Sequence, residues 1–156
     1  MPDKIFMKRA IALALENVQS DRGGPFGAII VKDGEVLAEA ANCVTLTNDP
    51  TAHAEIIAIR ETCKKLGAFQ LPGCEMYSSC EPCPMCTGAI YWARLARVYF
   101  ASTAADAAKA GFDDSLIYQE IQRPHAERKI PMIQLMREES LAAFRAWEQK
   151  PDKIGY

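Results

Sequence analysis

The sequence predicts an α/β fold in three layers, an α/β/α sandwich in which helices cover both faces of a central five-stranded mixed sheet. A helical pattern opens the chain, two strand-like segments joined by Asp33-Gly34 follow, and helical and strand-like segments then alternate. Asp-Gly between apolar runs is typical of a tight hairpin turn, and such an alternation places helices against both faces of a sheet. We expect one domain over residues 1–156, since this length suits a single core.

The first elements are an amphipathic helix and a hairpin. Apolar residues recur at helical spacing from Lys4 to Asp21, and Gly23-Gly24-Pro25 ends the pattern. The two strands are expected over residues 26–31 and 35–42. The first of them is apolar on successive residues, which is typical of a strand covered on both faces.

The remaining elements alternate along the chain. We expect a helix over 51–66 with Thr51 as its N-cap, a strand over 75–79, a helix over 84–93, a strand over 97–101, a helix over 106–121 broken at Gly111, a strand over 130–136 and a helix over 138–149. The helix over 84–93 is apolar nearly all round, which predicts burial on more than one side, as at a subunit interface.

Charge and hydropathy limit the classes of partner. The chain has 18 basic and 20 acidic residues and a net charge of −2, so it lacks the basic excess of a nucleic-acid binder. No nucleic acid and no membrane are expected as partners, because no apolar run approaches the length of a membrane span. The first residues do not resemble a signal peptide, and we expect a cytoplasmic location.

Two short segments contain the candidate metal-binding residues. His53-Ala54-Glu55 precedes Pro82-Cys83-Pro84-Met85-Cys86 by about thirty residues. One imidazole and two thiolates supply three zinc ligands, and three protein ligands leave one coordination position open for water, as in catalytic zinc sites. Taken singly, C-x-x-C is also typical of a redox pair or half of a structural site, and H-x-E of an ordinary helical turn.

The predicted elements bring the two segments together. Pro84 suits a first helical position, and thiols three residues apart lie on one face of a helix start. Helix N-termini favour anions, which stabilises the thiolate form that binds metal. We therefore expect zinc between two helix N-termini, with Glu55 beside it.

The other four cysteines are expected to be reduced thiols; they are Cys43, Cys63, Cys74 and Cys80. Cys80, Cys83 and Cys86 also resemble the beginning of an iron–sulfur run, but such a run needs a fourth cysteine, and Ile90 stands at that position. Cys80 is interpreted as a core residue at a strand end. His125 is interpreted as a surface histidine.

The two motifs resemble the zinc deaminase signature H-x-E…P-C-x-x-C, and the chain is similar to the cytidine deaminase-like superfamily over almost its whole length. Residues 48–55 and 81–86 carry the part that tRNA adenosine deaminases share. Residues 23–27, 79–86, 88–94 and 110–115 are similar to the branch of bacterial guanine deaminases.

The resemblance implies roles for individual residues. Zinc, one ion per subunit, would bind His53, Cys83 and Cys86, and Glu55 would carry protons during conversion of guanine to xanthine and ammonia. It also implies substrate contacts from Asn42 and Asp114, with Phe26 lining the pocket. Further candidates for substrate binding are Ala54, Asp113 and Tyr156. A homodimer is implied as well, with exchanged C-terminal segments as one arrangement.

Several of these residues have a plainer interpretation. Asn42 is also typical of a turn at a strand end, Phe26 of a core, and Asp113-Asp114 of a solvated loop or helix cap. The sequence does not decide which of the two aspartates contacts substrate. Residues 137–156, a helix and a tail ending in Tyr156, are a candidate cover for the active site of their own or a neighbouring subunit.

Other functions stay open at this point. A tRNA adenosine deaminase would share the metal site, and guanosine or cytosine are further substrates. A zinc-stabilised binding module is the alternative outside enzymes, although a structural site has no need of the unligated carboxylate of Glu55 and usually has a fourth protein ligand.

Overall fold

The computed structural model describes residues 3–156. The chain divides into two compact units, one ending at Asp114 and one running from Ser115 to Tyr156. Each unit is described by itself. The helices are α1 (Lys4–Gln19), α2 (Val44–Thr47), α3 (Ala54–Leu66), α4 (Pro84–Trp92), α5 (Ala104–Lys109), α6 (Ser115–Gln122) and α7 (Arg137–Gln149), with a short 3-10 helix at His125–Glu127. No helix within residues 3–156 combines the length and apolar character of a membrane span.

The first unit contains a mixed sheet. Its strands are β1 (Gly27–Lys32), β2 (Glu35–Ala41), β3 (Glu75–Cys80) and β4 (Arg97–Ser102), in the order β2-β1-β3-β4. β1 is antiparallel to β2 and to β3, and β3 is parallel to β4. The predicted hairpin is confirmed.

The prediction of five strands is wrong, because residues 3–156 form a sheet of four. Residues 130–136 were expected to be the last strand, but they adopt no regular structure. The segment has an apolar composition, yet Pro131 cannot donate to a ladder, and a strand exists only where a neighbouring strand pairs with it.

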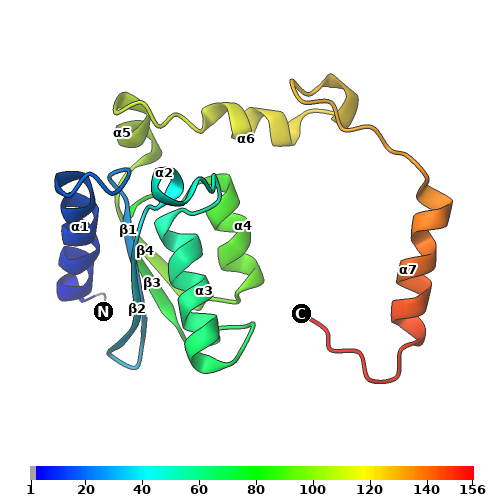
Figure 1. The fold of residues 1–156 in the computed structure, drawn as a ribbon, viewed down its shortest axis with the longest axis horizontal. Helices are drawn as coiled ribbons and strands as arrows, with labels where there is room; N and C mark the ends of the chain where they lie inside the picture. The colour runs from blue at the N-terminus through cyan, green and yellow to red at the C-terminus, as the bar shows by residue number, and fades with distance from the viewer. Residues whose placement is uncertain (1–2) are drawn as a thin grey trace. The chain divides into compact units, whose positions relative to one another are not determined.

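Helices cover both faces of the sheet, which confirms the layered arrangement of the prediction (Figure 1). On one face α1 packs through Ala10 against Ile29 and Tyr77. On the other, Ala54 and Ala58 of α3 and Ile90 of α4 pack against side chains of alternate strand positions, Ala28, Ile30 and Met76. Because strand side chains alternate between faces, consecutive apolar residues of β1 serve both cores.

Within one chain α4 is less buried than its composition suggests. Cys86 and Ile90 are buried, whereas Tyr91 is 78% and Trp92 64% exposed. The second unit likewise exposes apolar side chains along α6, α7 and the segment between them.

Candidate active site

The metal-binding segments lie at the N-termini of α3 and α4. His53 is the N-cap of α3 and Cys83 the N-cap of α4, both in extended conformation, with Pro84 opening α4 as predicted. The prediction that Thr51 is the N-cap of the helix over 51–66 is wrong. The Thr51 hydroxyl and backbone N–H both donate to Asp49 Oδ1, at 2.7 and 2.8 Å, in a turn that precedes the helix.

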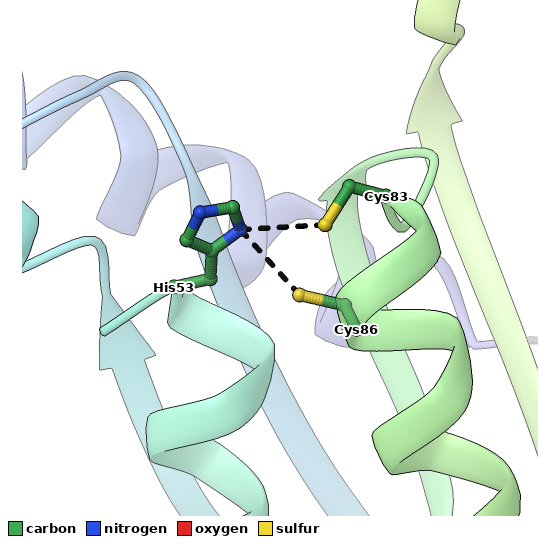
Figure 2. A group of neighbouring side chains, drawn as sticks. All are labelled: His53, Cys83 and Cys86. Atoms are coloured by element: carbon green, nitrogen blue, oxygen red, sulfur yellow. Dashed lines mark hydrogen bonds between the residues drawn. The ribbon is translucent and has the colours of Figure 1, made fainter. Parts of the chain in front are cut away.

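The three predicted ligands converge. Figure 2 shows the His53 ring directed between the two thiols, with Nδ1 3.6 Å from Cys83 Sγ and 3.5 Å from Cys86 Sγ. All three ligand atoms lie within 4.8 Å of one another. In a tetrahedral zinc site, bonds of about 2.3 Å to sulfur and about 2.0 Å to nitrogen separate S and N ligands by about 3.5 Å. The residues present therefore fit zinc.

The two cysteines differ in ionisation. A hydrogen bond from the Cys86 thiol, together with the His53 ring, lowers the pKa of Cys83 to about 4. That same hydrogen bond, together with burial, raises the pKa of Cys86 above its ordinary value. A divalent cation between them favours the thiolate on both.

Glu55 lies in the first turn of α3 and is 5% exposed. Burial raises the pKa of its carboxyl above the ordinary range, and the negative charge of Cys83 raises it further. Ser78 of β3, itself buried, donates a 3.4 Å hydrogen bond to Glu55 Oε1. A raised pKa moves the carboxyl toward the working pH, which favours a role as general acid/base.

Asn42 follows β2 and is buried. Its Oδ1 accepts a 3.2 Å hydrogen bond from Val44 N–H, so Asn42 does serve as a strand-end turn residue. The amide retains two N–H donors and a second lone pair on oxygen, which suits it to the edge of a purine. The half-buried Phe26 lies close by, since Asn42 N–H donates to the Phe26 carbonyl at 3.0 Å.

The loop after α5 contributes an aromatic ring and a carboxylate. Phe112 meets Phe26 edge-on, with ring centroids 4.9 Å apart. Asp114 is half-buried, and burial together with the negative charge of Cys83 raises its pKa. Asp113 is exposed, so the two aspartates differ in environment.

The remaining candidates are Ala54 and Tyr156. Ala54 is fully buried at the start of α3, between His53 and Glu55. Tyr156 belongs to the second unit and is 73% exposed. Its contact with substrate stays a prediction.

The cysteines outside the metal cluster form no disulfide bonds. Cys80 is buried and its thiol donates to the Thr103 carbonyl at 3.7 Å, which confirms it as a core residue at a strand end. All six cysteines are free thiols. His125 is exposed in the 3-10 helix, as predicted.

Sequence reasoning missed two residues that support the site. Ser78 could have been found from strand alternation, because it shares with Met76 the face of β3 that packs on α3. No pattern in the sequence indicated a supporting role for Glu81. Its Oε2 accepts a 2.9 Å hydrogen bond from Ala104 N–H and so ties the segment before Cys83 to the start of α5.

A three-layer α/β fold with a His/Cys/Cys cluster and a buried, unligated carboxylate beside it defines a zinc-binding hydrolytic deaminase. The model of the cytidine and deoxycytidylate deaminase zinc-binding region matches residues 1–102. The chain belongs to this family, which confirms the predicted relationship.

Within this family, the chain is similar to guanine deaminases in particular. The chain is 56% identical to a guanine deaminase of Bacillus subtilis (strain 168), over 156 residues that make up 100% of both sequences. An X-ray structure of guanine deaminase from Bacillus subtilis matches with a TM-score of 0.97, covering 100% of this chain and 99% of that one. A guanine deaminase structure from Nitrosomonas europaea is 29% identical with a TM-score of 0.69, covering 93% and 84%.

Proposed function

We propose that the protein is a guanine deaminase, which hydrolyses guanine to xanthine and ammonia. The observation that carries this proposal is the buried Glu55 carboxyl beside the His53, Cys83 and Cys86 cluster. The full-length similarity to a guanine deaminase supports guanine as the base.

The residues divide the chemistry between them. His53, Cys83 and Cys86 would hold one zinc ion per subunit, which would lower the pKa of bound water toward neutrality. Glu55 removes a proton from the attacking water and delivers it to N3 of guanine as oxygen bonds to C2. Glu55 then takes the proton of the new hydroxyl at C2 and passes it to the exocyclic nitrogen. The C2–N bond breaks as the C2=O double bond forms, and ammonia leaves. One carboxyl thus acts first as base and then as acid.

Recognition of guanine is assigned to groups on three segments. Asn42 offers both donors and an acceptor to the purine edge, and Phe26 offers a ring face for stacking. Of the two aspartates we assign substrate contact to Asp114, because it is the less exposed and lies within electrostatic reach of Cys83. A carboxylate accepts from N1–H of guanine, and adenine has no proton at N1.

A substrate screen tests the proposal. Zinc-loaded protein is incubated with guanine, guanosine, adenine, adenosine and cytosine, and ammonia is measured. Release from guanine alone, or far faster than from the others, is the expected result. Release from adenosine or cytosine but not guanine would contradict the substrate assignment.

A tRNA adenosine deaminase is the second candidate, because such enzymes are also similar to the chain. One from Agrobacterium fabrum is 44% identical over 95 residues, 61% of this chain and 62% of the relative. The net charge of −2 disfavours it. Binding to a tRNA anticodon stem-loop that weakens steeply with salt would support this candidate, since phosphate contacts make affinity salt-dependent.

Replacing Asn42 by alanine is expected to raise KM for guanine about 10- to 100-fold with a smaller change in kcat, because hydrogen bonds to the bound base are lost. Steady-state ammonia release measures both constants. Asn48→Gly is the matched control: Asn48 is exposed, ends α2 with φ of 52°, and glycine accepts that backbone conformation. Equal KM values for Asn42→Ala and the wild type would contradict the assignment.

We also propose that the protein acts as a homodimer in which residues 115–156 cover the site of the partner. Two features support this. The second unit exposes large apolar side chains, Ile117, Ile121, Ile133, Leu135 and Phe144 among them, and the first unit exposes Tyr91 and Trp92 of α4. Apolar surface of this extent is typical of an interface.

Hybrid dimers test the exchange. Subunits carrying Glu55→Gln and subunits carrying Tyr156→Ala are co-expressed with different tags, and the mixed dimer is purified. If the tail serves the partner's site, one of two sites has both residues intact, and we expect about half of wild-type activity. A mixed dimer no more active than the two parent variants would show that each tail serves its own subunit or none.

A further inference from the structure

We propose that Asn17, near the end of α1, is a positioning residue for the substrate pocket: its side-chain amide holds together the loop over residues 23–26 and the backbone at Asn42. This inference rests on the proposed function, since Asn42 and Phe26 are substrate contacts there. Neither the metal chemistry nor the deaminase motifs involve Asn17.

The environment of Asn17 is unusual for its helix. Ala10, Ala14 and Asn17 are the buried residues of α1, at the spacing of the face that packs on the sheet. Asn17 is the polar member of this stripe and is 4% exposed. Its Nδ2 donates two hydrogen bonds of 2.9 Å, one to the Gly24 carbonyl and one to the Asn42 carbonyl. Both donors of the amide are therefore used, on two segments far apart in sequence.

Both accepting segments lead directly to the proposed substrate contacts. The Gly24 carbonyl also accepts from Phe26 N–H at 2.9 Å, and the Phe26 carbonyl accepts from Asn42 N–H at 3.0 Å. Asn17, Gly24, Phe26 and Asn42 thus form a closed set of hydrogen bonds. Loss of the Asn17 amide would break two sides of it, leaving the Gly24 carbonyl with only the Phe26 N–H and removing the side-chain donor from the Asn42 carbonyl.

The glycines show how closely the loop approaches Asn42. A Cβ at Gly23 would lie 2.4 Å from the Asn42 carbonyl oxygen, closer than real contacts allow. A Cβ at Gly24 would lie 3.4 Å from the Phe26 ring and 3.7 Å from Asn42 Cγ. The loop therefore packs against the side chains of both substrate contacts, and a shift of the loop moves the ring and the amide together.

A purely structural role would be met by an apolar side chain at position 17, like the alanines that precede it on the same face. An asparagine in that position requires acceptors for both of its N–H groups, since an unpaired buried amide is costly. The acceptors it has are the carbonyls of Gly24 and Asn42, on the two segments that carry Phe26 and Asn42. Position 17 therefore affects pocket geometry as well as stability.

The test compares Asn17→Asp and Asn17→Ala with Ser20→Ala in the zinc-loaded, full-length protein. In Asn17→Asp a carboxylate oxygen faces the two carbonyls in place of a donor. Ser20 is the matched control, because its hydroxyl donates only to carbonyls of α1 itself, those of Glu16 and Asn17. Hydrogen exchange at the Phe26 and Asn42 amides is measured without substrate, and kcat and KM are measured with guanine.

Both Asn17 variants are expected to speed exchange at Phe26 and Asn42 and to raise KM about tenfold or more, with kcat changed less and zinc content unchanged. Ser20→Ala is expected to match the wild type. Folded Asn17 variants with wild-type KM and wild-type exchange at both amides would overturn the inference. If the wild type leaves guanine unchanged, the proposed function fails, while the exchange measurement still decides whether Asn17 holds the two segments.

Discussion

Glu55→Gln is expected to lower kcat/KM for guanine by about 10³-fold or more while zinc stays bound. Glutamine has nearly the shape of glutamate but cannot take a proton from water or deliver one to the base, and general acid–base catalysis contributes about 10² to 10⁴-fold. Here one carboxyl serves two proton transfers, so the effect is expected in the upper part of that range. Steady-state ammonia release and metal analysis on the same preparation measure it.

Glu61→Gln is the control for this substitution. Glu61 lies on the same helix, α3, and is exposed, so the charge change is the same without a change at the metal cluster. We expect wild-type activity for this control. A Glu55→Gln protein that retains zinc and deaminates guanine at the wild-type rate would remove Glu55 from the mechanism.

Cys86→Ser is expected to abolish both zinc binding and activity. Cys86 is fully buried, its Sγ lies 3.5 Å from His53 Nδ1, and a serine hydroxyl is a far weaker zinc ligand than a thiolate. Metal analysis should show about one zinc ion per chain in the wild type and little in the variant. Chelation of the wild type is expected to stop ammonia release, and added zinc to restore it.

The matched control is Cys63→Ser on α3. Cys63 is a half-buried free thiol that is not part of the metal cluster. It is expected to keep zinc and activity, although with some loss of stability from its apolar contacts. Retention of stoichiometric zinc by Cys86→Ser would mean that the metal has other ligands.

The metal cluster could be predicted from sequence because its geometry is mostly local. The spacing of Cys83 and Cys86 within one helical turn, and the position of Pro84, fix two ligands at a helix start. To predict His53 as the third ligand, it was enough to expect that the start of α3 lies near the start of α4. The structure places His53 one position outside the helix rather than within it.

The parts that could not be predicted depend on contacts distant in sequence. Residues 130–136 have the composition of a strand, but strand formation requires a partner, which a single segment does not reveal. Thr51 has the right residue type for an N-cap, but Asp49 competes for its hydroxyl. Asn17 gave no signal at all, because its role comes from two carbonyls brought to it by the turn at residues 20–26 and by β2.

The proposed substrate contacts fall between these cases. Asn42, Phe26 and Asp114 each had a plain interpretation as turn, core or loop residue, and their types alone could not decide. The structure adds their shared location: Asn42 bonds to the backbone of Phe26, whose ring meets Phe112 two residues before Asp114. Proximity of this kind follows from the tertiary fold and not from any one segment.

The fate of the water oxygen during the reaction tests the hydrolytic mechanism most directly. Zinc-loaded protein is incubated with guanine in ¹⁸O-labelled water, and xanthine and ammonia are quantified by mass spectrometry and by an ammonia assay. We expect equal amounts of the two products, with the label in the oxygen at C2 of xanthine. Zinc-replete protein that leaves guanine unchanged, or that forms xanthine without the label, would contradict this mechanism.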